Sequence, residues 1–263
     1  HGLTGPRSSW EMRRQPIGAR YSLIELIKRS GEADVSRAHT DFVANASHEL
    51  RTPLASVIGY IETMIDAGDN LDPKTSGRFL STVLREARRL QSLVEDLMSL
   101  SRVEAEKHDQ PRERWHAARL FPGAWGDSAG AERLDRLDMR TGEPSLIARG
   151  DPQQLEQLVR NLVDNALKYG TPGTKVHVSL TADEATWAVC TIRDHSEGIA
   201  SEHIPHLTRR FYRTDPGRSR AAGGTGLGLS IVKHIVERHR GRLDIKSKRS
   251  EGTTVTVRLP LAD

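Results

Sequence analysis

One run of residues, Ser47-His48-Glu49-Leu50-Arg51-Thr52-Pro53-Leu54, combines a nucleophile with groups that can assist it. An imidazole is partly neutral near pH 7 and can then attack an electrophile. Glu49 is adjacent and can accept a ring proton from His48 or fix its tautomer. Thr52 follows at i+4, so on a helix its hydroxyl shares a face with His48. The run indicates group transfer to His48, and the alternative is a surface histidine on an ordinary helix.

A second segment carries side chains that suit a hard cation and phosphates. Asn161 and Asn165 are spaced i, i+4, so they share one face of an expected helix. Amide oxygens are hard neutral ligands of the kind that suits Mg²⁺. Lys168 and Tyr169 follow on the next turn, where one can meet phosphate charge and the other can contact a nucleotide. The alternative is a plain polar helix face.

A carboxylate and a glycine-rich turn add groups for a nucleotide. Asp194 opens the run Asp194-His-Ser-Glu-Gly198-Ile199 at the end of an expected strand, where it can accept a hydrogen bond from the exocyclic amine of adenine. The run Gly224-Thr225-Gly226-Leu227-Gly228-Leu229 enters an expected helix, and backbone amides in such a turn bind phosphate. Alone the turn is a weak signal, because it lacks the lysine and spacing of a Walker A loop.

Arginines precede the glycine-rich turn in Arg209-Arg-Phe-Tyr-Arg213-Thr-Asp. The fixed charge of Arg213 can stabilise a transferring phosphoryl group. We interpret Arg209 and Arg210 as a surface basic cluster on a flexible loop. Residues 216–223 are rich in Arg, Ala and Gly and are typical of a mobile lid.

Two long amphipathic helices are expected to position His48. Apolar residues recur at spacings of three and four from about Asp34 to Ala67, and Gly68-Asp-Asn ends the pattern. Asp72-Pro73 supplies an N-cap and a first-position proline, and the same spacing then continues to about Glu106. A lone hairpin of this kind leaves apolar surface exposed. We therefore expect a homodimer in which two hairpins form a four-helix bundle.

The C-terminal half has a mixed pattern. We expect helices over 152–169 and 228–239, and strands over 175–180, 186–193, 243–246 and 253–259. Such an order predicts a sheet covered by helices on one face. The periodicity of residues 115–143 is too weak to assign elements.

In this order the segments resemble the motifs of sensor histidine kinases of two-component systems. Residues 42–54 resemble the H-box, 161–169 the N-box, 194–199 the G1 box, 209–215 the F-box and 224–229 the G2 box. Within the family, the chain most resembles the phosphate-regulon sensor kinases. The resemblance implies that His48 takes a phosphoryl group from ATP and that Glu49 acts as base. It also implies that Thr52 positions water when a phosphorylated response regulator is dephosphorylated.

The implied fold is α plus α/β. A dimeric four-helix-bundle histidine-phosphotransfer domain, residues 33–107, precedes an α/β sandwich of the histidine-kinase/chaperone/gyrase ATPase type, residues 108–263. Residues 1–32 hold two expected strands around a turn and are interpreted as the remnant of a PAS-type sensor domain. The implied ligands are ATP and Mg²⁺, with Asn161 and Asn165 as metal ligands. The implied partners are a second copy of the chain and the receiver domain of a response regulator.

Ser196 departs from the G1 pattern Asp-x-Gly-x-Gly, because serine stands where the first glycine belongs. If its Cβ strains the turn or crowds adenine, the chain is a weakened or phosphatase-biased kinase. If Ser196 keeps a negative φ and points to solvent, the serine is harmless. An ATPase of the chaperone or mismatch-repair kind would share the N-box and G1 chemistry but does not explain the residues around His48.

Composition and charge restrict the class of fold, the possible partners and the compartment. Charged residues make up 28% and aromatic residues 5%, which favours helical surface over a β-sandwich. The net charge of +4 is spread along the chain, so we expect no nucleic-acid partner. The single cysteine, Cys190, cannot form an internal disulfide and indicates a reducing compartment. No apolar run is long enough to span a bilayer, so we expect a cytoplasmic chain without membrane contact, with an anchor upstream as an open alternative.

Overall fold

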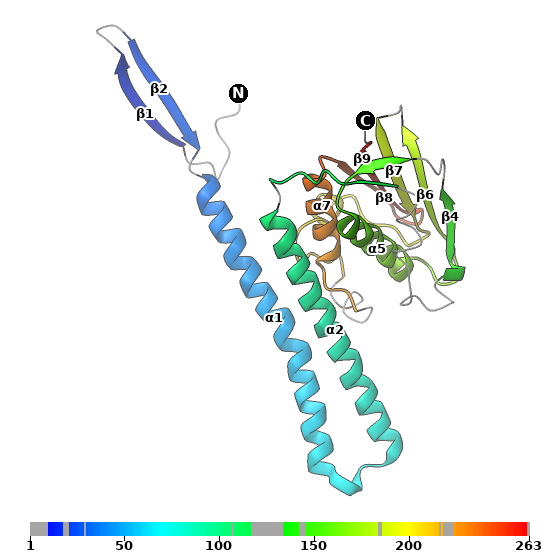
Figure 1. Ribbon diagram of the computed structural model, residues 1–263. Helices are drawn as coiled ribbons and strands as arrows, with labels where there is room; N and C mark the ends of the chain where they lie inside the picture. Colours follow the sequence, from blue (N-terminus) through cyan, green and yellow to red (C-terminus); the bar gives the residue numbers. More distant parts are fainter. Residues whose placement is uncertain are drawn as a thin grey trace.

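The computed structural model describes a β-hairpin, a helical hairpin and a C-terminal α/β unit (Figure 1). The described residues are 10–17, 21–28, 30–106, 108–116, 134–141, 146–183, 186–215, 217 and 223–261. Most of the expected lid over 216–223, and much of the unassigned segment 115–143, therefore lie outside the described residues.

The N-terminal strands and the helical hairpin follow the sequence prediction closely. Strands β1 (Trp10–Ile17) and β2 (Tyr21–Lys28) pair antiparallel. Helix α1 (Ser30–Ala67) begins slightly before the expected start, and the short 3-10 helix η1 (Gly68–Asn70) follows it. Helix α2 (Pro73–Ala105) then runs back alongside α1 (Figure 1).

The start of α2 shows why the chain turns there. The Asp72 side chain accepts hydrogen bonds from the backbone N–H groups of Lys74 and Thr75, each at 3.0 Å. Pro73 occupies the first helical turn, where its missing N–H costs no hydrogen bond. The ring centroids of Tyr60 and Phe79 lie 5.1 Å apart and join the two helices near this end.

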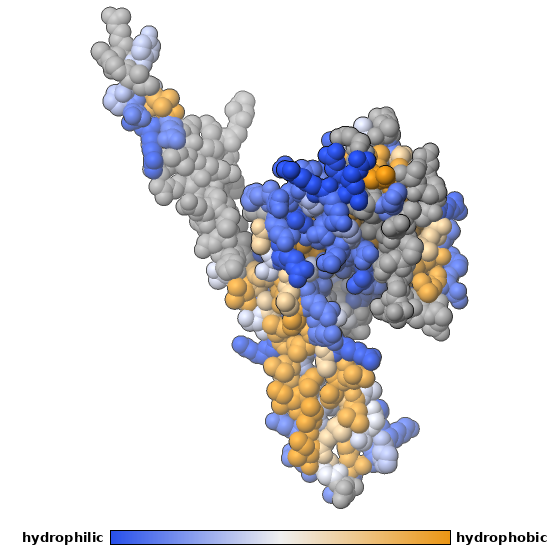
Figure 2. Space-filling model, in the orientation of Figure 1, coloured by the Kyte–Doolittle hydropathy of each residue, from blue (hydrophilic) through white to orange (hydrophobic). Residues whose placement is uncertain are grey.

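Both helices leave an apolar stripe exposed near the turn of the hairpin, and Figure 2 shows apolar residues covering that end. The stripe has helical spacing and consists of Leu54, Ile58, Ile61 and Ile65 on α1 and Leu80, Leu84, Val94 and Met98 on α2. Each of these side chains is 41% to 71% exposed, which is unusual for so many large apolar groups side by side. Within the described residues, no helix is both long and apolar enough to cross a membrane.

The C-terminal unit is built on one five-stranded sheet, of which the sequence predicts four strands; the fifth, over residues 137–141, lies in the segment to which the sequence assigns no element. Its strands are β4 (Leu137–Thr141), β6 (Val176–Asp183), β7 (Trp187–Arg193), β8 (Arg242–Lys248) and β9 (Gly252–Pro260). Their order in space is β4-β6-β7-β9-β8, with β4 parallel to β6 and the other pairs antiparallel. Strand β3 (Arg114–His116) pairs with β5 (Ile147–Arg149) in a small second sheet.

Helices α5 (Pro152–Tyr169) and α7 (Gly228–Arg238) pack together and against the sheet, and a short 3-10 helix, η3 (Ile204–His206), lies between β7 and α7 in sequence. The apolar side of α5 faces the core, where Leu158, Leu162 and Ala166 are buried as expected. The core also takes in the C-terminal turns of α2. Its Leu93, Leu100 and Val103 are at most 3% exposed and belong to the same cluster as the residues of α7. The helical hairpin is therefore docked on the α/β unit through a shared apolar core.

A polar junction closes the end of this interface. The guanidinium of Arg238 donates to the carbonyl oxygens of Glu106 and Asp109 and pairs with the Asp151 carboxylate at 3.3 Å. Next to it, the buried imidazole of His239 accepts a hydrogen bond from the N–H of Asp151 at 2.9 Å. Burial lowers the pKa of His239, which keeps the ring neutral and able to accept that bond.

We predict that Leu100→Ala lowers the free energy of unfolding by about 2–5 kcal/mol, because it opens a cavity where α2 meets the α/β core. Guanidinium chloride unfolding measures the change. Leu134→Ala is the matched control, since Leu134 is 44% exposed. A loss below about 1 kcal/mol for Leu100→Ala, in the range of ordinary surface substitutions, would contradict the shared core.

Candidate functional site

His48 lies on α1 with its side chain exposed, as its position outside the apolar spacing predicts. Thr52, one turn later, donates its hydroxyl proton to the carbonyl oxygen of His48 at 3.2 Å. Pro53 lies within the helix and is buried. It has no N–H to give to the carbonyl of Glu49, so the helix is locally short of one hydrogen bond beside His48. The imidazole and the Thr52 hydroxyl are thus on one accessible side of α1.

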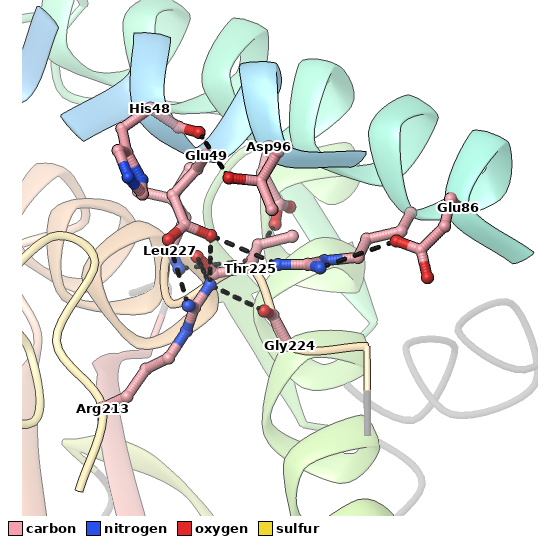
Figure 3. A network of polar contacts seen from close by, with 10 residues as sticks. His48, Glu49, Glu86, Asp96, Arg213, Gly224, Thr225 and Leu227 are labelled. Carbon is pink, nitrogen blue, oxygen red and sulfur yellow. Dashed lines mark hydrogen bonds and ion pairs between the residues drawn. The ribbon is translucent and has the colours of Figure 1, made fainter. Parts of the chain in front are cut away.

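The Glu49 carboxylate is held between two arginines. Arg89 of α2 approaches it at 3.3 Å, and Arg213 of the segment before the glycine-rich turn approaches it at 2.9 Å. The exposed fractions of the side chains are 13% for Glu49, 13% for Arg89 and 6% for Arg213. Charge-assisted hydrogen bonds that are this sheltered from water are among the stronger polar contacts in proteins. Figure 3 shows Arg213 reaching Glu49 from the side opposite α1.

Arg213 also holds the glycine-rich turn. Its Nη2 donates to the carbonyl oxygens of Gly224 and Thr225, both at 2.9 Å (Figure 3). Its Nε is buried and has no hydrogen-bond partner among the residues that the structure describes. A buried donor without a partner is costly, so this position of Arg213 leaves part of its bonding capacity unused. One side chain therefore connects the residue after His48 to the turn expected to bind phosphate.

The glycine-rich turn makes a second contact with the helical hairpin. The Thr225 hydroxyl donates to the Asp96 carboxylate of α2 at 2.6 Å and accepts from the Leu227 N–H at 3.3 Å. Burial raises the pKa of Asp96, while the hydrogen bond from Thr225 opposes that rise. Gly226 has φ of +77°, and a Cβ there would press on the backbone of Phe211, which explains the glycine.

Aromatic and charged residues complete the docking surface. The ring of Phe211 lies 5.9 Å from that of Phe42 on α1, measured between centroids. The Arg210 guanidinium lies over the Phe42 ring at 4.8 Å and pairs with Glu104 of α2. His234 of α7 also approaches Glu104, at 3.2 Å.

The interpretation of Arg210 as part of a free surface cluster is therefore wrong. Arg210 faces Glu104 of α2 and the Phe42 ring across the interface. Both partners are far from Arg210 in sequence, so the sequence around Arg210 does not indicate them. Arg209 is exposed, in agreement with the expectation for it.

The polar face of α5 lies beside the same turn. Asn161 and Asn165 are half-buried, and the Asn161 amide approaches the Gly228 carbonyl oxygen at 3.5 Å. Lys168 follows on this side, with its Nζ 5.8 Å from the centroid of the Tyr169 ring. Among the described residues there is no group of three or more His, Cys, Asp or Glu side chains that could hold a metal ion. A cation here would need oxygen ligands from outside the protein.

Asp194 is held at the end of β7, where its side chain is 7% exposed. Its Oδ1 accepts hydrogen bonds from the N–H groups of Ser196 at 2.9 Å and Thr253 at 3.1 Å. No partner of Oδ2 is found among the residues that the structure describes, so this oxygen remains available to a ligand. Gly198 has φ of +70°, and a Cβ there would overlap the carbonyl oxygen of Lys248.

The rest of the G1 turn has ordinary geometry. Ser196 is not among the described non-glycine residues with positive φ, and its hydroxyl accepts from the Gly198 N–H at 3.3 Å. The Ile199 N–H donates to the Ser247 hydroxyl at 2.8 Å. The N–H of Thr171, just after α5, donates to the carbonyl oxygen of His195, which ties this turn to the N-box helix.

Sequence analysis missed the residues of α2 that receive the α/β unit. Arg89, Asp96 and Glu104 lie about two helical turns apart and so share one side of α2. That spacing of charged residues along an otherwise amphipathic helix was the available signal. Thr253 gave no signal in the sequence, because it orients the Asp194 carboxylate through its backbone N–H and not through its side chain.

Comparisons with known proteins agree with these motifs. Residues 38–106 match the family model of the His Kinase A (phospho-acceptor) domain, and residues 150–263 match that of the histidine kinase-, DNA gyrase B-, and HSP90-like ATPase. The phosphate regulon sensor protein PhoR of Pseudomonas aeruginosa is 38% identical over 85% of this chain and 52% of its own length. The sensor histidine kinase RppB of Synechocystis is 38% identical over 84% of this chain and 48% of its own length.

A solved structure gives the same answer for the fold. The Acinetobacter baumannii histidine kinase AdeS is 25% identical, with a TM-score of 0.63, over 82% of this chain and 98% of that chain. The chain spans about half the length of the curated relatives it matches. Its phospho-acceptor hairpin and its ATPase unit occur in the family's order, and the predicted resemblance to phosphate-regulon sensor kinases is confirmed. The chain belongs to the sensor histidine kinases of two-component systems.

Proposed function

We propose that this chain is the catalytic core of a sensor kinase that phosphorylates His48 from ATP and passes the phosphoryl group to an aspartate of a response regulator. The observation that carries the proposal is the position of Arg213. It contacts Glu49, next to His48, and the backbone of Gly224 and Thr225. The phosphate-binding turn thus abuts the helical turn that bears the nucleophile.

In the proposed reaction, a ring nitrogen of His48 attacks the γ-phosphorus of ATP. The new N–P bond forms while the bond from phosphorus to the β,γ-bridging oxygen breaks, and ADP leaves. Glu49 receives the ring proton. Transfer of this kind depends mainly on positioning and on neutralising charge on the phosphoryl oxygens, which are the roles of Arg213 and the G2 amides.

Asp194 and the N-box face would hold the nucleotide. The unpaired Oδ2 of Asp194 fits the exocyclic amine of adenine. Asn161 and Asn165 present amide oxygens, which fit Mg²⁺, and the ion would neutralise phosphate charge when bound. The few protein ligands on offer fit this ion as well, since Mg²⁺ keeps several waters and takes oxygens from substrate phosphates.

The docked arrangement corresponds to a resting state in this proposal. Glu49 cannot act freely as a base while Arg89 and Arg213 both hold its carboxylate. Arg213 would have to exchange Glu49 for the γ-phosphate, which releases the base and supplies the charge in one movement. The unpaired Nε of Arg213 supports two alternative positions for this side chain.

Partners follow from surfaces that the hairpin leaves open. The apolar stripe of α1 and α2 is of the kind that a second hairpin buries in a four-helix bundle, which supports a homodimer. His48 and Thr52 are exposed on α1, where a receiver domain could reach both of them. Exposure of Thr52 also supports phosphatase activity toward the regulator.

We predict that His48→Ala reduces acid-labile, base-stable phosphorylation to background, because the nucleophile is gone. Dimerisation should persist, since the side chain is exposed and outside the apolar stripe. Incubation with γ-labelled ATP followed by gel filtration measures both properties. His108→Ala removes another exposed histidine and should label like the unaltered chain. Label retained in His48→Ala would exclude His48 as the acceptor.

We predict that Asn165→Ala weakens Mg²⁺-ATP binding roughly tenfold or more, equivalent to about 1.4 kcal/mol. Thermal stability without nucleotide should change little, because the side chain is only half-buried. Calorimetric titration gives the affinity. Gln153→Ala is the control, as it removes an exposed amide from the first turn of the same helix. Equal affinities for Asn165→Ala and the unaltered chain would remove Asn165 from the site.

The alternative of a weakened or phosphatase-biased kinase rests on Ser196. Its φ is not positive, so backbone strain gives no support to the alternative, and only crowding of adenine remains. We therefore predict that Ser196→Gly changes nucleotide affinity by less than about threefold, well below 1.4 kcal/mol. Titration with a nucleotide analogue tests this, with Ser201→Gly as a control for added flexibility. A tenfold gain in affinity would favour the weakened-kinase alternative.

A further inference from the structure

A group of three side chains lies on the β4 side of the five-stranded sheet. Asp138 of β4 and His177 of β6 are directly paired in register, and His195 follows the end of β7. The Asp138 carboxylate lies 2.8 Å from Nδ1 of His177. Nε2 of His177 lies 3.4 Å from Nε2 of His195, and the two rings are nearly perpendicular at 80°.

The carboxylate fixes the tautomer of His177. Nδ1–H donates to Asp138, so the lone pair of a neutral ring is on Nε2 and points toward His195. This hydrogen bond from His177 is the main reason that the pKa of Asp138 lies below its ordinary value. A histidine oriented through Nδ1 by a carboxylate, with Nε2 free, is the usual arrangement of a metal-bound imidazole.

The separation of the two nitrogens suits a shared ion as well as a long direct hydrogen bond. Hydrogen bonds donated by N–H groups normally span about 2.7–3.2 Å, so the 3.4 Å between the Nε2 atoms is long for one. A tetrahedral ion at about 2.0–2.1 Å from each of two nitrogens places them about 3.4 Å apart. The observed spacing therefore matches one edge of a tetrahedral coordination shell.

The surroundings leave room for other ligands. The side chains of His177 and Asp138 are 43% and 35% exposed, so water can reach this group from the open side of the sheet. His195 also lines a hollow of about 380 Å³ beside Thr171 and Glu251. Cys190, the chain's only cysteine, is buried and cannot compete for a metal.

We propose that His177 and His195 bind a divalent transition-metal ion of the Zn²⁺ class through their Nε2 atoms, with Asp138 as the orienting partner and water completing the shell. Imidazole nitrogens suit Zn²⁺ over Mg²⁺ or Ca²⁺, which separates this site from the Mg²⁺ proposed at the N-box. The ion would join β6 to the turn that begins at Asp194, because His195 is the next residue. It would thereby couple metal binding to the adenine end of the nucleotide site.

The test is calorimetric titration of the chelator-treated chain with ZnCl₂, without nucleotide or Mg²⁺. One ion per chain is expected at the site. His177→Ala and His195→Ala should each weaken binding by more than tenfold, and Asp138→Asn should weaken it about 10–100-fold, as loss of an orienting partner does. His116→Ala removes an exposed histidine from β3 of the same unit and should leave the affinity unchanged.

Circular dichroism confirms that each variant is folded, which is expected because the altered side chains are partly or fully exposed. Absence of a stoichiometric Zn²⁺ site in the unaltered chain would overturn the proposal. So would a His177→Ala/His195→Ala double variant that binds as tightly as the unaltered chain, or a loss in His116→Ala equal to that in His177→Ala. Because no nucleotide is present, these results are independent of kinase activity.

Discussion

The ion pair between Glu49 and Arg213 is the contact on which the arrangement of the two halves depends. It is sheltered from water, it is shared with Arg89, and it lies one residue from the proposed phosphoryl acceptor. Removing Glu49 would leave the Arg213 charge without its carboxylate in a poorly solvated place, which costs far more than a surface ion pair contributes. The same carboxylate therefore holds the halves together and is unavailable for proton transfer while it does so.

The apolar contact behind this ion pair makes docking part of the fold. Leu100 and Val103 of α2 are as deeply buried as the core of the α/β unit itself. Arg238 and His239 then seal the far end through backbone groups of Glu106 and Asp151. A movement of Arg213 toward ATP must either keep this apolar contact and pivot about it or break it at considerable cost. The geometry favours a local rearrangement of the Arg213 side chain.

Much of the fold could be predicted because its signals are local. The N-cap at Asp72, the proline after it and the spacing of apolar residues determine both long helices within a few residues. Nucleotide-site candidates were also found locally, since each motif is contiguous. Contacts between the motifs could not be predicted in this way, because a pair such as Glu49 and Arg213 joins residues far apart in sequence. Arg210 was misassigned for that reason.

The backbone hydrogen bond from Phe211 to Gly226 closes a loop at its base, with the N–H and the carbonyl oxygen 2.9 Å apart. Closing a loop costs conformational entropy, and doubling the length of the loop adds only about 0.6 kcal/mol to that cost. Arg213, Gly224 and Thr225 lie inside the stretch that this bond closes, and the contacts of Arg213 with Glu49, Gly224 and Thr225 fix their places in it. A change in chain length between these fixed residues would therefore cost little closure entropy, provided that Arg213 and the glycine-rich turn keep their contacts.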